Sequence, residues 1–416
     1  MSNADALEWV RQAGRLFDEK KLDEAARLAQ QALQHDPKLA RARQVMGLVR
    51  IEHGALADGM AQLQTALALQ PDLVPSHIGL GRGYSYLGDT ERALQCFEAA
   101  LRLEPSQPFA HFNRALTLLK RGNFHEGWLD YEWRFQVGQV QRPEMKRPRW
   151  DGSPLNGRAL MISTEQGMGD VLQFIRLLPR VRRQETRIVF ACQKALHALL
   201  RPLADVDEWF PIDTPGNITF DLHAPLLSLP GLLGVDEASI PAAVPYLPVD
   251  ADRVEAWRGR IESLPGLKVG IVWQGSPTLQ GDRFRSIPLA RFAPLAAVAG
   301  ITLVSLQKGA GVEQIDSQRA AVPLATFDDL DRDAPFVDTA AVLQHLDLVI
   351  TIDSAVAHLA GGLGRPVWTL LSTASDWRWL EGRADSPWYP TMRLFRQTTL
   401  GDWDPVFEQV IAGLPR

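Results

Sequence analysis

The stretch LDLVITIDSAVAHLAGGLGRPVWTLL, residues 346–371, decides the fold of the C-terminal part of the chain. It begins with an apolar run, ends with a second one, and holds a segment rich in alanine and leucine between them. Short, nearly continuous apolar runs on either side of a helix are typical of parallel strands that are covered on both faces. Because Asp347, Asp353, His358 and Arg365 interrupt the stretch, it does not predict a membrane span.

The same alternation extends toward the N-terminus. Further strands are predicted at 159–163, 187–192, 268–273 and 301–306, with helices between them. A new strand–turn unit begins at 266–275 after a helical stretch over 250–264. We therefore predict two doubly wound Rossmann-like domains in series, 158–250 and 251–416, with a cleft between them. A last helix is predicted over 403–414, placed to pack back across the two halves.

The first third of the chain is built on a repeat of 34 residues. Small residues, prolines and turn glycines return at this interval: Ala13, Gly47, Gly81 and Ala115; Ala25, Gly59, Ala93 and Gly127; Ala32, Ala66 and Ala100; Pro37, Pro71 and Pro105; Gly54, Gly88 and Gly122. This period is the signature of the tetratricopeptide repeat, a pair of antiparallel helices. Small residues let the helices cross closely, glycine suits the turn, and proline ends the second helix. We predict a helical solenoid over residues 1–136.

The repeat decays in its fourth copy, 108–135, where aromatic residues gather: Trp128, Tyr131, Trp133 and Phe135. These side chains either cap the solenoid and dock it on the next domain, or line a peptide-binding surface; solenoids of this kind usually bind peptides or proteins. A junction follows at 137–157. It is rich in proline, and basic residues gather in it and at its end: Arg142, Lys146, Arg147, Arg149 and Arg158. It is interpreted as a solvated linker or as a contact with an anionic substrate.

Composition excludes several classes of protein. The 44 basic and 49 acidic residues give a net charge of −5, so we expect no nucleic-acid partner. Only two cysteines occur, Cys96 and Cys192, which excludes a disulfide framework and suits a reducing compartment. The N-terminus carries acids where a signal peptide carries basic residues, and no uncharged apolar run reaches about 18 residues. We expect a cytoplasmic protein with no transmembrane segment.

Three loops follow predicted strands at the edge where parallel sheets bind ligands. The first, STEQGMGD at 163–170, has two glycines that let a ligand approach the backbone. Asp170 stands at the start of a helix predicted over 171–178. It is either the N-cap of that helix or a general base at the edge of the cleft.

In the second loop, 275–289, Arg285 and Ser286 precede a helix, which suits a phosphate group, although a solvated loop has the same composition. In the third, Asp353 follows a strand, Ser354 caps a helix and His358 lies one turn on. A diphosphate fits such a helix N-terminus. His358 has a second interpretation, as a structural histidine. A hydrolase triad is excluded because Ser354 and His358 share one helix face and lack an independent base.

At these loops the sequence resembles glycosyltransferases of the GT-B fold, in particular the ADP-heptose:lipopolysaccharide heptosyltransferases of glycosyltransferase family 9. EQGMGDVLQFIRLLP at 165–179 is similar to the family's first glycine–aspartate loop, and DLVITIDSAVAHLAGGLGRPV at 347–367 to its donor-side motif. WQGSP at 273–277 and SLQKG at 305–309 resemble two further donor-lining loops. The resemblance implies an acceptor-side half, 158–250, and a nucleotide-sugar half, 251–416. The lipopolysaccharide enzymes carry no repeats, so their acceptor and their ADP-heptose donor are not carried over.

The resemblance implies that Asp170 is the catalytic base. Together with the loop chemistry, it predicts a set of donor-binding residues: Gly169, Gln274, Arg285, Ser286, Lys308, Glu313, Asp353, Ser354 and His358. Cationic side chains and helix dipoles would support the leaving diphosphate, so no metal or other cofactor is expected. The D-x-D triplets at 205–207, 250–252 and 331–333 are interpreted as solvated loops and not as a metal site.

The predicted function is metal-independent, inverting transfer of a sugar from a nucleotide-diphosphate donor to a protein acceptor that the repeats recruit. The tandem of repeats and transferase domain, joined by YEWRF at 131–135, is similar to a bacterial group of repeat-bearing glycosyltransferase-like proteins. Two alternatives stay open: a nucleotide-sugar epimerase or hydrolase on the same fold, and a non-catalytic adaptor. The tryptophans at 368, 377, 379 and 388 either stack on a sugar or base, or pack the interior.

Overall fold

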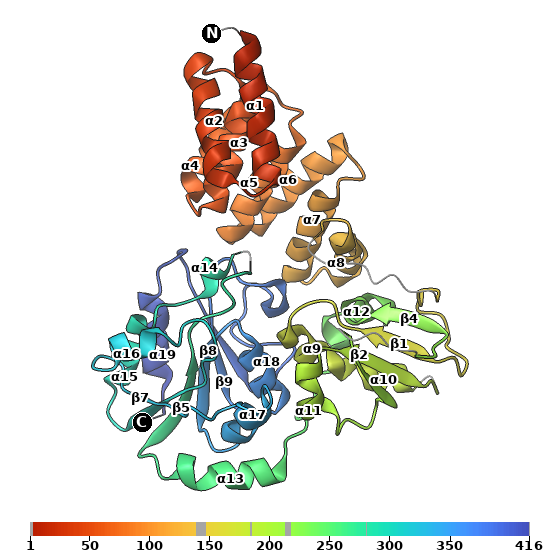
Figure 1. The fold of residues 1–416 in the computed structure, drawn as a ribbon, viewed down its shortest axis with the longest axis vertical. Coiled ribbons are helices and arrows are strands. Elements are labelled where there is room, and N and C mark those ends of the chain that lie inside the picture. Colours follow the sequence, from red (N-terminus) through yellow and green to blue (C-terminus); the bar gives the residue numbers. More distant parts are fainter. Residues whose placement is uncertain (1–2, 139–146, 184, 213–217, 280, 416) are drawn as a thin grey trace. The chain divides into compact units, whose positions relative to one another are not determined.

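The computed structural model describes residues 3–138, 147–183, 185–212, 218–279 and 281–415. The chain forms two compact units, residues 1–139 and 140–416 (Figure 1). The first unit is helical and the second is an α/β unit, as the sequence predicts. Residues 139–146 of the basic junction, with Arg142 and Lys146, lie outside the described residues.

The first unit consists of helical hairpins that follow one another along the chain. Its helices are α1 (Asn3–Asp18), α2 (Leu22–His35), α3 (Ala40–Glu52), α4 (Leu56–Leu69), α5 (Val74–Tyr86), α6 (Thr90–Leu103), α7 (Pro108–Lys120) and α8 (Phe124–Tyr131). Each hairpin packs on the next (Figure 1). The predicted solenoid of paired helices is confirmed.

The repeated small residues have the roles that their spacing predicts. Gly54, Gly88 and Gly122 adopt φ values of 84°, 79° and 83°, a left-handed conformation that favours glycine. Lys20 takes the same turn position in the first hairpin with a φ of 63°. A Cβ atom on Gly47 would lie 2.8 Å from the carbonyl oxygen of Gly59, so only glycine lets α3 and α4 cross this closely.

The fourth hairpin closes the solenoid with aromatic side chains. Its second helix, α8, has only eight residues and continues into a 3-10 turn, η1 (Glu132–Phe135). Trp128 and Tyr131 are buried, and Trp133 stacks on His111 with ring centroids 4.2 Å apart. The side chain of Arg134 is also buried, over the ring of Phe135 at 4.1 Å. These contacts lie within the repeat unit and support the capping interpretation.

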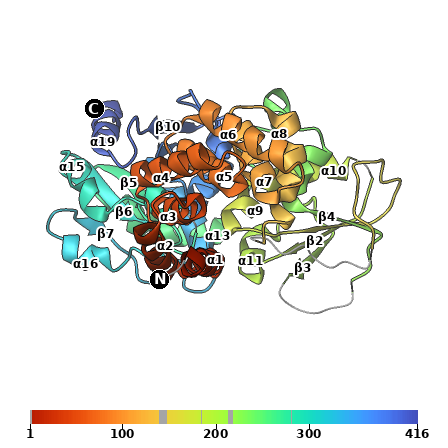
Figure 2. The ribbon, with the colours of Figure 1, turned by 90° about the horizontal axis from the view of Figure 1, so that it is seen from above.

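The α/β unit begins with a parallel sheet of order β3-β2-β1-β4, of which Figure 2 labels β3, β2 and β4. Its strands are β1 (Leu160–Ser163), β2 (Ile188–Cys192), β3 (Glu208–Pro211) and β4 (Leu222–Pro225). The first two confirm the predicted runs. The other two are absent from the prediction because each has only four residues and ends in proline, and β3 is half-exposed at the edge of the sheet.

The second half of this unit is built on a six-stranded parallel sheet of order β10-β9-β8-β5-β6-β7. Its strands are β5 (Leu267–Val272), β6 (Ile301–Ser305), β7 (Leu324–Ala325), β8 (Leu348–Ile352), β9 (Val367–Leu371) and β10 (Met392–Arg396). Sequence patterns miss β7 and β10. The last helix, α19 (Asp404–Gly413), buries Phe407 and Val410 in the core of this half. Its predicted packing across the two halves is therefore wrong.

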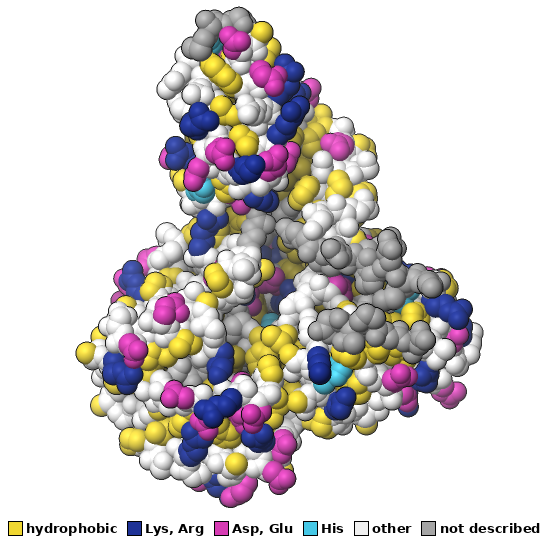
Figure 3. Space-filling view, viewed as in Figure 1, with side chains coloured by type: hydrophobic (Ala, Val, Ile, Leu, Met, Phe, Trp, Pro, Cys, Tyr) yellow, Lys and Arg dark blue, Asp and Glu magenta, His cyan; other side chains and the backbone are white. Residues whose placement is uncertain are grey.

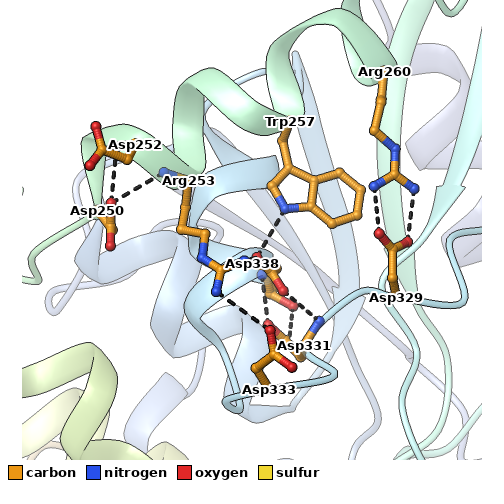
Figure 4. Close-up of polar contacts among 10 residues, drawn as sticks. Asp250, Asp252, Arg253, Trp257, Arg260, Asp329, Asp331, Asp333 and Asp338 are labelled. Atoms are coloured by element: carbon orange, nitrogen blue, oxygen red, sulfur yellow. Dashed lines mark hydrogen bonds and ion pairs between the residues drawn. The ribbon is translucent and has the colours of Figure 1, made fainter.

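The acidic triplets lie at exposed or half-exposed positions, as predicted, and some of their carboxylates also bond to the backbone; Figure 4 shows the triplets at 250–252 and 331–333. Asp250 caps α13 (Ala251–Glu262) by accepting hydrogen bonds from the amides of the next turn. Asp331 accepts a bond of 2.9 Å from the amide of Thr339, and Asp207 accepts one of 2.7 Å from Ile188. In the described part of the chain, no group of three or more His, Cys, Asp and Glu residues is arranged to hold a metal ion.

Within the described ranges, every helix is too short or too polar to cross a bilayer. On the face drawn in Figure 3, basic and acidic side chains are interspersed over the second unit.

Candidate active site

The site lies where the chain order of both sheets reverses. In the first sheet β1 pairs with β2 on one side and with β4 on the other, and in the second sheet β5 pairs with β6 and with β8. Open parallel sheets bind ligands outside the carboxyl ends of the strands at such switch points. The loops after β1, β5, β8 and β9 begin at these ends, and they carry the residues described next.

Asp170 comes from the loop after β1. The helix there, α9 (Met168–Phe174), begins earlier than predicted, with Gly167 at the N-cap position and Asp170 in the first turn. Asp170 is therefore not the N-cap. Its carboxylate instead accepts a hydrogen bond from Nη2 of Arg378, which belongs to the other half of the unit. This pairing places Asp170 at the boundary between the halves. Its side chain is 18% exposed and therefore remains accessible to solvent.

The two halves meet closely at Gly169. A Cβ atom on this glycine would lie 3.1 Å from Cδ2 of His358 and 3.3 Å from Cα of Ala355. Both of these residues belong to α18 (Ala355–Gly362), so the N-terminal turns of α9 and α18 pack against each other. The visible role of Gly169 is this close approach. A contact between Gly169 and a donor stays a prediction.

Arg285 and Ser286 tie the loops after β5 and β8 together. Arg285 ends the short helix α14 (Asp282–Arg285); its Nη1 donates a 2.8 Å bond to the carbonyl of Asp353, and its Nε pairs with Asp282. The hydroxyl of Ser286 also donates to Asp282, and it accepts a 3.0 Å bond from the amide of Gly275. A Cβ atom on Gly275 would lie 2.4 Å from the guanidinium of Arg285, so glycine allows this close approach. The predicted arginine thus meets the backbone of Asp353 at the switch point, whereas the predicted serine bonds within the loop after β5.

Ser354 and His358 differ in part from their predicted arrangement. Ser354 occupies the N-cap position of α18, but its hydroxyl lies 2.9 Å from that of Thr351 and does not cap the helix. His358 is buried, hydrogen-bonds the Tyr389 hydroxyl at 2.9 Å, and stacks on Trp379. Burial, with Arg378 as a second cause, holds the pKa of His358 well below its usual range. These contacts favour the structural interpretation of this histidine.

The other predicted donor residues form a separate group. Gln274 accepts a 2.8 Å bond from the side chain of Gln314. Lys308 donates to the carbonyl of Leu330, and Glu313 accepts a 2.8 Å bond from the amide of Gly311. These contacts lie within and beside the loops after β5 and β6. A role of these three residues in donor binding stays a prediction.

Three carboxylates and two guanidiniums converge at the boundary. Burial raises the pKa of Asp170, with Asp376 adding to the effect and Arg378 opposing it. Burial and the charge of Asp376 raise the pKa of Asp353 to about 6, against the opposing charge of Arg285. A carboxylate whose pKa is raised toward neutrality is a stronger base than an exposed one, and it still releases its proton near pH 7.

Two of these residues, Asp376 and Arg378, are absent from the predicted site. They stand in the sequence DWRW, just after the strand that was predicted at 366–371. The rule that selected the other loops, position at the carboxyl end of a parallel strand, also selects this one. The sequence prediction for this segment concerns its tryptophans alone. Trp377, Trp379 and Trp388 are buried, which confirms the packing interpretation for these three.

Two known families match parts of this chain. Residues 78–127 match the tetratricopeptide repeat, and residues 335–400 match glycosyltransferase family 9 (heptosyltransferase). The second match includes β8, α18, β9 and the DWRW sequence. The protein named Protein FlbA, from Caulobacter vibrioides, is 32% identical over 419 residues, covering 94% of this chain and 70% of that protein. The chain belongs to the same family as Protein FlbA.

The chain is a glycosyltransferase that carries tetratricopeptide repeats. Two solved structures are similar to it. The family 9 glycosyl transferase of Veillonella parvula is 12% identical, with a TM-score of 0.47, over 64% of this chain and 92% of that one. A mutant of the O-GlcNAc transferase of Thermobaculum terrenum is 15% identical, with a TM-score of 0.36, over 88% of this chain and 82% of that one.

Proposed function

We propose that this glycosyltransferase moves a sugar from a nucleotide-diphosphate donor to a protein acceptor that the repeats recruit, with inversion and without a metal. One observation carries the proposal: Asp170 projects from the first half of the α/β unit to the cluster of Arg378 and Asp376 on the second half. A base on one half and cationic groups on the other are the two elements that glycosyl transfer from an activated donor requires.

The donor is assigned to the second half. The loops after β5 and β8 meet there through Arg285 and the backbone of Asp353, and α18 directs its N-terminus to the same place. A helix N-terminus offers amide groups and a partial positive charge to phosphate oxygens. These features support the charge that develops on the leaving diphosphate, which is why the proposal needs no metal.

Asp170 acts as the base in the reaction. The hydroxyl oxygen of the acceptor forms a bond to the anomeric carbon while the bond from that carbon to the phosphate oxygen breaks. The electron pair of the broken bond stays on the diphosphate, and the acceptor proton passes to Asp170. A single displacement of this kind inverts the anomeric configuration. The raised pKa of Asp170 suits it to accept that proton near neutral pH.

The protein acceptor and the cytoplasmic location are part of the proposal. Tetratricopeptide solenoids bind peptides and proteins, and a small-molecule acceptor would not require one. Neither Cys96 nor Cys192 takes part in a disulfide, and proteins of reducing compartments usually lack disulfides.

Thermal unfolding with a panel of ADP-, GDP-, UDP- and dTDP-linked sugars at millimolar concentration tests the donor site. We expect one nucleotide to raise the melting temperature by a few degrees, because a ligand that binds only the folded state stabilises it. Arg285→Gln should lose this shift. Arg291→Gln is the control, because Arg291 pairs with Asp404 on the exposed surface, and it should keep the shift. No shift with any nucleotide would contradict the proposal, and conversion of the donor without an acceptor would favour an epimerase or hydrolase.

A further inference from the structure

Arg378 holds carboxylates from both halves of the α/β unit with one guanidinium. It lies in the 3-10 turn η7 (Trp377–Trp379), and its side chain is only 7% exposed. Nη2 donates to Asp170 on α9, while Nη1 donates a 2.8 Å bond to Oδ1 of Asp376. The same oxygen of Asp376 accepts a 2.9 Å bond from the backbone amide of Arg378. Asp376 therefore fixes the arginine from its own loop, and Asp170 is the partner from across the boundary.

Aromatic side chains hold the guanidinium on its other sides. Its central carbon lies 4.4 Å from the ring centroid of Trp377 and 5.4 Å from that of Phe174, a residue of α9. Rings at this distance attract a cation and leave it few other positions. The two carboxylates remain more open, since the side chains of Asp170 and Asp376 are 18% and 33% exposed. A ligand that enters the site therefore meets the carboxylates and the edge of the guanidinium that faces them.

This arrangement creates a competition. Asp170, Asp353 and Asp376 bring three negative charges to the site, against the two positive charges of Arg285 and Arg378. Arg285 is already bonded to Asp282 and to the carbonyl of Asp353. A diphosphate that binds here therefore needs the guanidinium of Arg378, whose planar fork fits two phosphate oxygens as well as it fits a carboxylate. Asp170 and the phosphate compete for the same donor group.

This competition changes how readily Asp170 accepts a proton. While Nη2 of Arg378 donates to Asp170, the ion pair stabilises the charged carboxylate and occupies one of its oxygens, which weakens it as a proton acceptor. We propose that Arg378 is a donor-operated switch on the base: the phosphates of the nucleotide-sugar take the guanidinium from Asp170, and the freed carboxylate then accepts the acceptor proton. This inference rests on the proposed function. It requires the donor to bind before the acceptor is activated.

The proposed switch predicts that a substitution within the site strengthens the binding of the nucleotide. If Asp170 competes with phosphate for Arg378, removing the charge of Asp170 should strengthen nucleotide binding, because coupling between two ligands of one group is reciprocal. A role of Asp170 in structure alone predicts equal or weaker binding. The probes are ADP, GDP, UDP and dTDP, each titrated by calorimetry into the full-length protein. For the nucleotide that binds, we expect Asp170→Asn to lower the dissociation constant by at least about fivefold.

A double-variant cycle isolates the role of the arginine. Arg378→Gln should weaken nucleotide binding, and in that background Asp170→Asn should no longer strengthen it. Asp376→Asn tests the same competition with Arg378 intact, and it should also tighten binding. Asp316→Asn is the control, since Asp316 is 90% exposed and pairs with Arg319 in its own turn; it should leave binding unchanged.

The outcomes separate the switch from the proposed function. Tighter binding by Asp170→Asn that depends on Arg378 supports the switch. If the wild-type protein binds a nucleotide but Asp170→Asn changes its affinity less than twofold, or tightens it equally in the Arg378→Gln background, the switch is overturned and the donor site stands. If the wild-type protein binds none of the four nucleotides, the donor site and the switch are both overturned.

Discussion

Some residues at the boundary between the halves are suited to a role in the reaction, but they lower the free energy of unfolding. Asp353 is the clearest case, because burial and the neighbouring Asp376 raise its pKa from the usual 3.8 to about 6. The folded protein therefore binds this proton more tightly than the unfolded chain does. By linkage, the contribution of Asp353 to stability falls as the pH rises from about 4 to about 6, and it stays unfavourable above that range.

Asp353→Asn should therefore stabilise the protein at pH 8 by about 1–3 kcal/mol, since the buried charge is gone. At pH 4, where the wild-type carboxyl is protonated in the folded state, the gain should vanish. Urea unfolding of both proteins at the two pH values measures the difference. Asp316→Asn, which removes an exposed carboxylate, is the control. An equal difference between wild type and Asp353→Asn at pH 4 and pH 8 would contradict this account.

The sequence identifies part of this residue set. Asp353, Ser354 and Arg285 follow strands that their apolar runs reveal, and the structure brings them to one switch point. Two details depend on geometry that spacing does not contain. Asp170 pairs with an arginine 208 residues away, and His358 becomes neutral because Tyr389 and Trp379 enclose it. The first contact arises only when the two halves fold against each other, and the second only when distant segments of the second half pack together.

At the scale of elements, the crossing of α9 and α18 holds the two halves together. Gly169→Val places a branched side chain where even a Cβ atom lies 3.1 Å from His358, so we expect a loss of about 1–3 kcal/mol in the free energy of unfolding. Gly259→Val is the control, because Gly259 lies in the exposed helix α13 and a Cβ atom there meets nothing within 4 Å. Its effect should stay within about 0.5 kcal/mol.

Denaturant unfolding of the two variants measures this difference. Equal stability of Gly169→Val and Gly259→Val would show that the α9–α18 crossing tolerates separation. A loss in Gly169→Val that is accompanied by weaker nucleotide binding would further indicate that the crossing aligns the site.

Elements with strong patterns are predictable and short edge elements are not. The fully buried strands β2 and β8 are continuous apolar runs, and each is predicted to within two residues. The strand β7 has only two residues, and β10, at the edge of its sheet, has two arginines among its five residues. Their pairing with a neighbouring strand, and not their own composition, makes them strands.

At the scale of the whole molecule, the two units have separate cores and are expected to respond separately to mutation. A Cβ atom on Gly81 would lie 2.4 Å from Phe97, inside the repeat unit. Gly81→Val should therefore lower the unfolding temperature of the repeat unit, while the transition that nucleotide binding shifts stays in place. Gly14→Val, in a helix of the same unit where a Cβ atom meets nothing within 4 Å, is the control.

The same pair of variants tests the role of the repeats. Under the proposed function, Gly81→Val should lose transfer of labelled sugar into protein but keep nucleotide affinity, as measured by calorimetry and by label counting. If transfer into protein persists after the repeat unit has melted, the repeats do not recruit the acceptor.

The central claim is that Asp170 accepts the proton of the attacking hydroxyl. The initial rate of sugar transfer by full-length Asp170→Asn, compared with wild type and with the Asp316→Asn control, tests it most directly. General-base catalysis is worth about 10²–10⁴-fold. We predict a fall of at least about 100-fold in the rate constant for transfer, with nucleotide bound at least as tightly as by wild type. Transfer by Asp170→Asn at the wild-type rate would contradict the claim.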